Sequence, residues 1–264
     1  MTPVLMLGAG RLGGALIEGW SRFGGPAPSD LLILDPSPSP AALAAGQAGA
    51  ALSPGPQDFA RAGVVLLAVK PQIWREAAAA ISPHLAPGAV IVSVAAGVRA
   101  ADISSAFGGR KVARVMPTTA VAVGRGVASL YGADPEAVAR ARDLFGPVAT
   151  VVELAEEELL HAATGVSGSA PAYFYAFVEA LEAAGAAAGL PAAASRDLAR
   201  ATMVGAAALL DASGEDPAEL RRQVTSPGGT TEAALAILMG RAGLGPLLRD
   251  AVAAAARRSE ELGG

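Results

Sequence analysis

Two glycine-rich turns contain the residues best suited to chemistry, and the first lies near the start of the chain. It has the G-x-G-x-x-G spacing and consists of Gly8, Ala9, Gly10, Arg11, Leu12 and Gly13. In such a turn Gly8 permits a tight bend, Gly10 lets the backbone approach a pyrophosphate, and Gly13 lets helix and strand pack closely. The free N–H groups at the helix start would hold the phosphate. The pattern predicts a dinucleotide site, and the alternative is a glycine turn without a ligand.

Asp35 ends the second apolar run and lies 22 residues beyond Gly13, with Pro36 directly after it. At this place an acidic side chain accepts hydrogen bonds from the ribose hydroxyls of the cofactor, and its charge repels a 2′-phosphate. Asp35 therefore predicts NAD(P)H as cofactor with a preference for NADH. The alternative is an aspartate that only forms a turn before the proline.

Two further loops follow candidate strands, at the edge where open α/β sheets bind ligands. The first contains Ala68, Val69, Lys70 and Pro71, and the second contains Ala95, Ala96 and Gly97. The Lys70 ammonium would contact cofactor or substrate oxygens, unless it is an exposed lysine at a strand end. The small side chains of the second loop leave room for a flat nicotinamide, or they serve close packing alone.

The second glycine-rich turn is the most unusual local sequence of the chain. It reads Thr225, Ser226, Pro227, Gly228, Gly229, Thr230, Thr231 and Glu232. Two glycines before hydroxyl residues at a helix start expose consecutive N–H groups, which form a nest for a carboxylate. The alternative is a loop capped by Thr230. The segment 167–173 offers the same choice between a helix cap that closes a site and a helix cap only.

The composition narrows the remaining chemistry. The chain has 264 residues, no cysteine, and two histidines, His84 and His161, which are 77 residues apart. Thiolate catalysis is excluded, and a histidine-based metal site has almost no ligands. A net charge of −4, aromatic residues at 4% and the lack of a basic cluster argue against nucleic acid as a partner. Without a membrane span or a secretory signal, we expect a cytoplasmic protein that uses an organic cofactor.

Short apolar runs must position these residues. They lack the alternation of apolar and polar side chains that half-exposed strands show. They cover 4–7, 31–34, 64–69, 90–94 and 112–116, and helical stretches separate them. This arrangement predicts a doubly wound parallel sheet of the Rossmann type. Two more candidate strands, 127–131 and 150–153, bracket a helix that begins with Asp134 as N-cap and Pro135 in its first turn.

After about residue 156 only helices are expected. They cover 192–212, 230–240, 246–262 and a first stretch that Ser169 caps and that runs to Gly189. We therefore expect a dinucleotide-binding domain at 1–157 and an all-α domain at 158–264. The second domain has so much Ala, Leu and Val around its helices that we expect it to bury this surface in a homodimer.

In this order the motifs resemble the pyrroline-5-carboxylate reductase family over essentially the whole chain. The most specific resemblance is at 224–231, and others are at 8–13, 68–71, 95–98, 115–119 and 167–173. The resemblance implies a Rossmann domain, a helical dimerisation domain, and reduction of a cyclic imino acid to L-proline as the last step of proline biosynthesis. A larger ring of dimers is also implied as an assembly.

The resemblance assigns roles by position. The substrate-binding residues would be Ser226, Gly228, Gly229, Thr230 and Thr231, with the Thr231 hydroxyl as the catalytic group that bonds the ring nitrogen or the carboxylate. The cofactor-binding residues would be Gly8, Gly10, Arg11, Leu12, Gly13, Asp35, Pro36, Ala68, Val69, Lys70, Pro71, Ala95 and Gly97. Glu157 matches an acid near cofactor and substrate in the family, or it belongs to a solvated helix start.

The chain departs from the family pattern at three places. Thr118 and Ala120 stand where the family usually has the Asn and the second Pro of Met-Pro-Asn-Thr-Pro, Ala170 replaces a glycine, and Asp35 replaces a small polar residue. Two alternatives therefore stay open. One is a reductase of another cyclic imine or of a small hydroxy acid on the same fold, and the other is a non-catalytic dinucleotide sensor. The predicted carboxylate nest disfavours the sensor.

Overall fold

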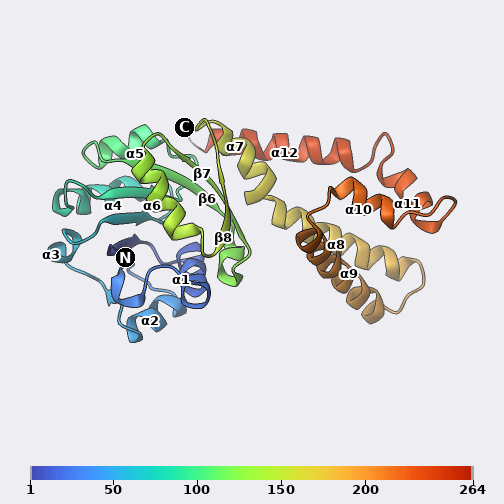
Figure 1. Ribbon diagram of the computed structural model, residues 1–264, viewed down its shortest axis with the longest axis horizontal. Helices are drawn as coiled ribbons and strands as arrows, with labels where there is room; N and C mark the ends of the chain where they lie inside the picture. The colour runs from blue at the N-terminus through green and yellow to red at the C-terminus, as the bar shows by residue number, and fades with distance from the viewer. Residues whose placement is uncertain (1, 263–264) are drawn as a thin grey trace. The chain divides into compact units, whose positions relative to one another are not determined.

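The protein was analysed as a computed structural model that describes residues 2–262 (Figure 1). Eight strands of the described chain form one sheet in the order β3-β2-β1-β4-β5-β6-β7-β8, and only the β6–β7 pair is antiparallel. The strands are β1 Val4–Leu7, β2 Leu31–Leu34, β3 Ala51–Leu52, β4 Val64–Leu67, β5 Val90–Ser93, β6 Val112–Pro117, β7 Gly126–Gly132 and β8 Ala149–Glu153. The predicted Rossmann-type sheet is confirmed.

Helices cover both faces of this sheet, and a helical region follows it. The α-helices around the sheet are α1 Arg11–Phe23, α2 Pro40–Gln47, α3 Pro56–Phe59, α4 Trp74–Ile81, α5 Ala100–Ala106 and α6 Pro135–Phe145. Short 3-10 turns are η1 Pro28–Asp30, η2 Ser82–His84 and η3 Thr119–Val123. The later helices are α7 Leu159–Ala163, the π-helical turn η4 Thr164–Gly168, α8 Ala170–Ala187, α9 Ala192–Ser213, α10 Pro217–Gln223, α11 Thr230–Leu238 and α12 Leu244–Glu261.

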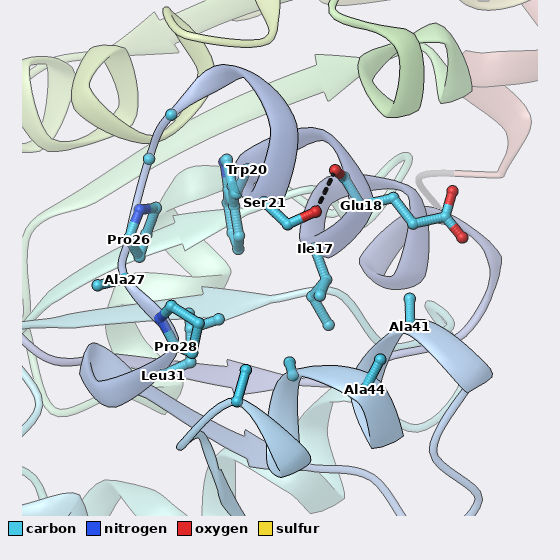
Figure 2. Close-up of a pocket in the computed structure, with 14 residues that line it drawn as sticks. Ile17, Glu18, Trp20, Ser21, Pro26, Ala27, Pro28, Leu31, Ala41 and Ala44 are labelled. Carbon is cyan, nitrogen blue, oxygen red and sulfur yellow. Dashed lines mark hydrogen bonds between the residues drawn. The ribbon is translucent and has the colours of Figure 1, made fainter.

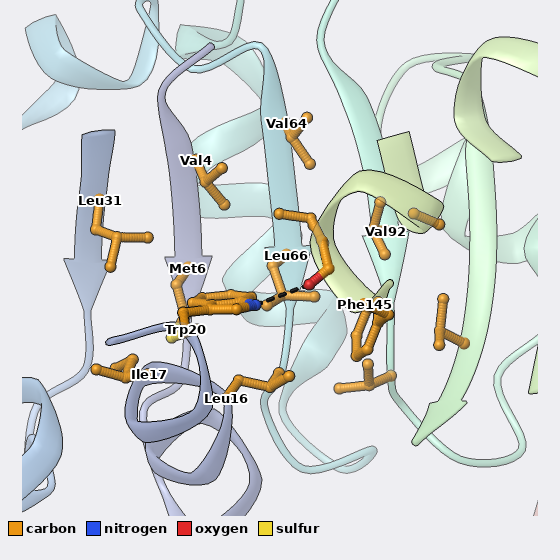
Figure 3. Packing of buried hydrophobic residues seen from close by; sticks show 14 of the residues in the cluster. Val4, Met6, Leu16, Ile17, Trp20, Leu31, Val64, Leu66, Val92 and Phe145 are labelled. Carbon is orange, nitrogen blue, oxygen red and sulfur yellow. Dashed lines mark hydrogen bonds between the residues drawn. The ribbon is translucent and has the colours of Figure 1, made fainter. Parts of the chain in front are cut away.

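Successive strand residues contribute to two separate cores, one on each face of the sheet. Val4 and Met6 pack with α1 and α6, whereas Leu5 and Leu7 pack with α4 and α5. This alternation follows from the two-residue repeat of a strand, and burial on both faces explains the continuous apolar runs. On the first face the Trp20 indole N–H donates to the carbonyl of Leu144 at 2.7 Å (Figure 3). The indole nitrogen is the one polar atom of the buried Trp20 side chain, and this bond satisfies it.

Most predicted elements agree with the structure to within two residues, and the exceptions have local causes. Asp134 caps α6 as predicted, because its Oδ1 accepts from the N–H groups of Glu136 and Ala137. Ser169 occupies the N-cap position of α8, but its side chain makes no capping bond. The helical backbone enters α8 directly from the π-turn η4, so the expected side-chain cap is wrong there. The strand β3 and the helices α7 and α10 were not expected.

The contacts divide the chain into two compact units. The first comprises residues 2–168 together with 254–262, and the second comprises residues 169–253. Within the second unit α8 and α9 pack side by side, and large apolar side chains on both helices stay exposed. Examples are Phe174 at 58%, Tyr175 at 73% and Val204 at 69% exposure. Such a surface is typical of a protein interface. Among the described helices none combines the length and apolarity that a membrane crossing requires.

Candidate active site

The glycine turn between β1 and α1 has the geometry that its spacing predicts. Gly8 has a φ of +92°, and a Cβ there would lie 2.7 Å from the carbonyl oxygen of Ala68. A Cβ at Gly13 would lie 2.5 Å from the carbonyl oxygen of Gly8, so a side chain would force the helix away from the turn. A Cβ at Gly10 would meet nothing within 4 Å. The turn is therefore closed toward the sheet and open at Gly10.

The first turn of α1 fits an anionic group. Its first intrahelical bond of the i to i−4 type runs from Gly14 N–H to the Gly10 carbonyl at 2.7 Å. The N–H groups of Arg11 and Leu12 precede that bond and have no acceptor within the helix. No acidic residue lies in this turn. Backbone donors and the positive end of the helix dipole therefore favour a phosphate here, as a dinucleotide would supply.

Asp35 bonds directly to this turn. Its Oδ2 accepts from the N–H of Ala9 at 2.5 Å, and its Oδ1 accepts from the N–H of Ser37 at 2.7 Å. The second bond is the Asx-turn of the alternative interpretation, and Pro36 lies exposed within it. Each carboxylate oxygen can accept more than one bond, so Asp35 keeps acceptor capacity for a ribose hydroxyl. Its structural role and a ribose-binding role are therefore compatible.

The register of the sheet brings the predicted cofactor residues to one edge. Leu7, which precedes Gly8, pairs with Leu34 on one side and with Leu67 on the other, and Leu67 pairs with Ser93. The residues that follow these strand ends include Asp35, the loop from Ala68 to Pro71, and the loop from Ala95 to Gly97. Lys70 is exposed, whereas Ala95 and Gly97 are buried. Open α/β sheets bind ligands at this carboxyl edge.

A buried ion pair near this edge was missed by the sequence analysis. Arg114 lies in the middle of β6 with its side chain 3% exposed, and its Nη1 donates to Oε1 of Glu157 at 2.8 Å. The same Oε1 accepts from the N–H of Ala100 at 2.6 Å. The interpretation of Glu157 as part of a solvated helix start is wrong, because its carboxylate is engaged by a buried guanidinium. The signal in the sequence was a single arginine within an apolar strand.

The second glycine-rich turn lies in the helical unit and starts α11. Gly228 has a φ of +70°, and its N–H donates to Oε2 of Glu232 at 2.7 Å. The N–H of Gly229 donates to the carbonyl of Ser226 at 3.0 Å. Gly229 is the N-cap, so Thr230 is the first helical residue and the alternative with Thr230 as cap is wrong. The N–H groups of Thr230 and Thr231 lie in the first helical turn, where no intrahelical acceptor is available.

Two of the departures from the family pattern lie at buried positions, and one of them makes a hydrogen bond. Thr118 is buried, and its hydroxyl accepts from the N–H of Val127 at 3.1 Å, which fixes the connection between β6 and β7. Ala170 is buried at the start of α8. The Thr118 hydroxyl thus supports the backbone at the end of β6.

A cavity beside α1 and α2 does not coincide with these residues (Figure 2). It has a volume of about 460 Å³ and is lined by the end of α1, by α2 and by the loop before β2. Ile17, Trp20 and Leu31 form its apolar wall. Leu31 begins a strand whose other end leads to Asp35, so the cavity lies at the amino edge of the sheet. Within residues 2–262 no cluster of acidic or histidine side chains could hold a metal ion.

A mainly parallel sheet with a glycine turn suited to a phosphate at its carboxyl edge, followed by a helical unit, is typical of a dinucleotide-dependent oxidoreductase. The family described as pyrroline-5-carboxylate reductase dimerisation matches residues 157–262, and the family described as NADP oxidoreductase, coenzyme F420-dependent, matches residues 3–97. The pyrroline-5-carboxylate reductase of Pisum sativum is 39% identical over 97% of this chain and 94% of its own length. That of Pseudomonas aeruginosa is 37% identical over 99% of this chain and 97% of its own length. The chain belongs to the pyrroline-5-carboxylate reductase family.

Solved structures agree with this assignment. A pyrroline-5-carboxylate reductase from Coxiella burnetii superposes with a TM-score of 0.90 at 26% identity and covers 100% of this chain and 99% of its own. The enzyme from Plasmodium falciparum, solved with NADP bound, gives a TM-score of 0.83 over 100% of this chain and 98% of its own. At 24% identity the latter shows the shared fold alone. The predicted family and fold class are confirmed, and the helical part of the chain is a dimerisation domain of this family.

Proposed function

We propose that this chain reduces 1-pyrroline-5-carboxylate to L-proline with NAD(P)H, the last step of proline biosynthesis. The curated relatives that share more than a third of its residues over nearly the whole length have the corresponding name. The single observation that supports the proposal best is the common register of β1, β2, β4 and β5. It places the glycine turn, Asp35 and two loops of small residues along one edge of the sheet.

The residues present suffice for this reaction class. The bound nicotinamide would supply a hydride, and a protonated cyclic imine accepts a hydride without a protein nucleophile. The tasks left to the protein are to bind the two molecules, to orient them and to exclude water. In our proposal Gly8, Gly10 and the N–H groups of Arg11 and Leu12 bind the pyrophosphate, and Ala95 and Gly97 leave space for the nicotinamide ring.

The glycine turn before α11 would bind the substrate. The N–H groups of Thr230 and Thr231 would hold its carboxylate, and the Thr231 hydroxyl would bond the ring nitrogen. The Gly228 N–H donates to the Glu232 carboxylate in the structure. It would bind the substrate carboxylate as well once this bond to Glu232 is broken. The hydrogen bond from the Gly229 N–H to the Ser226 carbonyl would fix the shape of the turn.

We also propose that NADH is the preferred cofactor. The support is the acidic side chain of Asp35 at the end of β2, bonded to the N–H of Ala9 within the phosphate-binding turn. A fixed negative charge at this place disfavours a 2′-phosphate.

The assembly we propose is a homodimer that acts in the cytoplasm, and we propose that such dimers associate into a larger ring. The exposed apolar side chains of α8 and α9 and the match to a dimerisation domain support the dimer. Sedimentation at micromolar concentration tests it, and a stable monomer would contradict it. Cell fractionation tests the location.

One assay tests the reaction. Purified protein is mixed with 1-pyrroline-5-carboxylate and either NADH or NADPH, and oxidation of the cofactor is followed by its absorbance. We expect turnover with both cofactors and a higher kcat/KM with NADH. Turnover of another cyclic imine or of a small hydroxy acid in place of this substrate would reassign the enzyme. Cofactor binding without any turnover would identify a sensor and would refute the proposal.

A further inference from the structure

Arg114 is a buried cation whose position in the sheet is unusual. Its neighbours in β6, Ala113 and Val115, belong to the core with α1 and α6, so Arg114 points to the opposite face, beside α5. Its Nε is buried and has no hydrogen-bond partner among the described residues. A buried charge of this kind is costly unless a partner compensates it. The unbonded Nε is the part of this guanidinium that stays uncompensated, so the fold retains Arg114 at some cost in stability, which points to a use for the side chain.

The compensating partner is Glu157, and the pair does more than neutralise charge. Oε1 of Glu157 accepts from Nη1 of Arg114 at 2.8 Å and from the N–H of Ala100 at 2.6 Å. Ala100 is the first residue of α5. One carboxylate oxygen thus joins the middle of β6 to the start of α5, through two hydrogen bonds that its charge strengthens.

The segment between β5 and α5 is consequently held at both ends. At its start the N–H of Ala95 donates to the hydroxyl of Ser93 at 3.2 Å, and Ser93 pairs with Arg114 in the sheet. At its end Ala100 is held by Glu157. The loop from Ala95 to Gly97 lies within this segment, and Gly97 has a φ of +77°. This is the loop that our proposed function places beside the nicotinamide ring.

We propose that Arg114 is a positioning residue for hydride transfer, because its buried guanidinium holds Glu157 against Ala100 and so fixes the loop from Ala95 to Gly97. Arg114 does not itself touch cofactor or substrate in this account. The proposal rests on the proposed function, since it is the reductase reaction that requires a precisely placed nicotinamide. A misplacement of about 1 Å is enough to lower a rate by about 100-fold.

The first test uses the cofactor-free protein. Hydrogen exchange of the peptide 94–103 is compared in the wild type, Glu157→Gln, Arg114→Lys and Arg114→Met. We expect faster exchange at the Ala100 amide in all three variants, least in Arg114→Lys, which keeps the charge. The matched control is Glu153→Gln, which removes the charge from an Arg142–Glu153 pair of 2.6 Å whose side chains are about half exposed. Exchange of 94–103 should be unchanged in this control.

The second test measures turnover with NAD(P)H that is deuterated at the transferred position. In Glu157→Gln and Arg114→Met we expect kcat to fall by about 10-fold to 100-fold and the isotope effect on kcat to rise, because hydride transfer becomes slower than product release. KM for the cofactor should change by less than about threefold, because the groups that bind its pyrophosphate are untouched. Arg114→Lys should restore part of kcat relative to Arg114→Met.

The outcomes separate this proposal from the proposed function. A wild-type protein that turns over nothing refutes the function. A wild type that turns over, with variants whose exchange at 94–103 and isotope effect are unchanged, refutes the positioning role. A variant whose kcat falls only in proportion to its folded fraction also refutes it, because a merely structural arginine would act in that way. If Arg114→Met does not fold, Glu157→Gln and Arg114→Lys decide by the same two measurements.

Discussion

The carboxylate of Glu232 accepts a hydrogen bond from the N–H of Gly228 at 2.7 Å, so the chain provides its own anion to an amide that we assign to the substrate carboxylate. We expect Glu232→Gln to lower KM for 1-pyrroline-5-carboxylate by about threefold to tenfold, or about 0.6–1.4 kcal/mol, with kcat unchanged. A neutral amide is the weaker acceptor, and it does not repel the incoming carboxylate. Steady-state kinetics at several substrate concentrations measures the effect.

The control for this variant is Glu219→Gln, which neutralises an acid on α10, whose Oε1 lies 3.5 Å from the Gln223 amide. It should leave KM unchanged. An unaltered KM in Glu232→Gln would show that the Gly228 amide takes no part in substrate binding.

The two glycines Gly10 and Gly13 should respond differently to alanine. A Cβ at Gly13 would lie 2.5 Å from the Gly8 carbonyl oxygen, so Gly13→Ala should destabilise the protein by about 1–3 kcal/mol. A Cβ at Gly10 meets nothing within 4 Å, so Gly10→Ala should keep its Tm without cofactor. Its Kd for NADH should rise by about tenfold or more, since the methyl group would lie where the pyrophosphate approaches. Thermal unfolding with and without NADH distinguishes the two variants, and equal behaviour would contradict the assignment.

Asp35→Asn should shift the cofactor preference toward NADPH. The amide oxygen of asparagine can still accept from the Ala9 N–H, although its NH2 group cannot accept from the Ser37 N–H, so the glycine turn should persist while the charge that repels a 2′-phosphate is lost. We expect the ratio of kcat/KM for NADH to that for NADPH to fall by about tenfold, or about 1.4 kcal/mol. Asp58→Asn on α3 is the control and should leave the ratio unaltered. A wild type that already prefers NADPH would refute this role of Asp35.

Thr231→Ala should lower kcat/KM by about 10-fold to 100-fold, because a hydrogen bond to a charged group contributes about 1.5–3 kcal/mol. The half-buried Thr231 follows Thr230 in the first turn of α11, so its loss should leave the fold intact. Thr231→Ser keeps the hydroxyl and should retain most of the activity. Equal kinetics for Thr231→Ala and the wild type would remove this hydroxyl from the mechanism.

The N-cap of α6 predicts a stability change in acid. Partial desolvation raises the pKa of Asp134, but the N–H groups of Ala137 and Glu136 and the Lys111 ammonium outweigh it and leave the pKa below its ordinary value of 3.8. A lowered pKa means that the charged form stabilises the fold above about pH 4 and that this contribution is lost as the pH falls below 3.8.

Asp134→Asn tests this dependence, because asparagine caps a helix equally well without the charge. The Tm of the wild type should exceed that of the variant at neutral pH, and the difference should shrink steadily as the pH falls below 3.8. The hydrogen bond from Lys111 to Glu136 raises the pKa of Lys111 above 10.5, so the difference should be constant between pH 5 and 9. A difference that stays constant as the pH is lowered from 5 through 3.8 and below would contradict the charge effect.

The sheet and its binding edge could be predicted from the sequence because local rules determine them. Apolar runs without alternation form strands buried on both faces, and the glycine spacing between 8 and 13 identifies the first turn after a strand. Once the strands are parallel and adjacent, Asp35 and Ala95 must lie at the edge where Gly8 lies. These expectations needed no knowledge of side-chain contacts.

The features that were missed depend on contacts between distant parts of the chain or on weak local signals. Strand β3 has only two residues and forms by pairing with β2. Helix α10 has Asp216 as N-cap and Pro217 as its first residue. The same pair of residue types correctly predicted the start of α6, but the sequence analysis did not apply it to α10. The ion pair of Arg114 and Glu157 joins residues 43 positions apart, and no periodic pattern indicates such a pair. The bond from Gly228 to Glu232 depends on a single side-chain rotamer.

The last turns of α12 belong to the same compact unit as residues 2–168, and Nδ1 of His161 lies 2.9 Å from the hydroxyl of Ser259. A ribosome makes residues 169–253 before it reaches Ser259. The unit that contains the sheet therefore receives residues 254–262 only after the whole of residues 169–253 has been synthesised. A protein expressed as residues 1–168 alone would lack that segment. The roles of the two units are therefore better studied by point mutations in the full chain than by truncation.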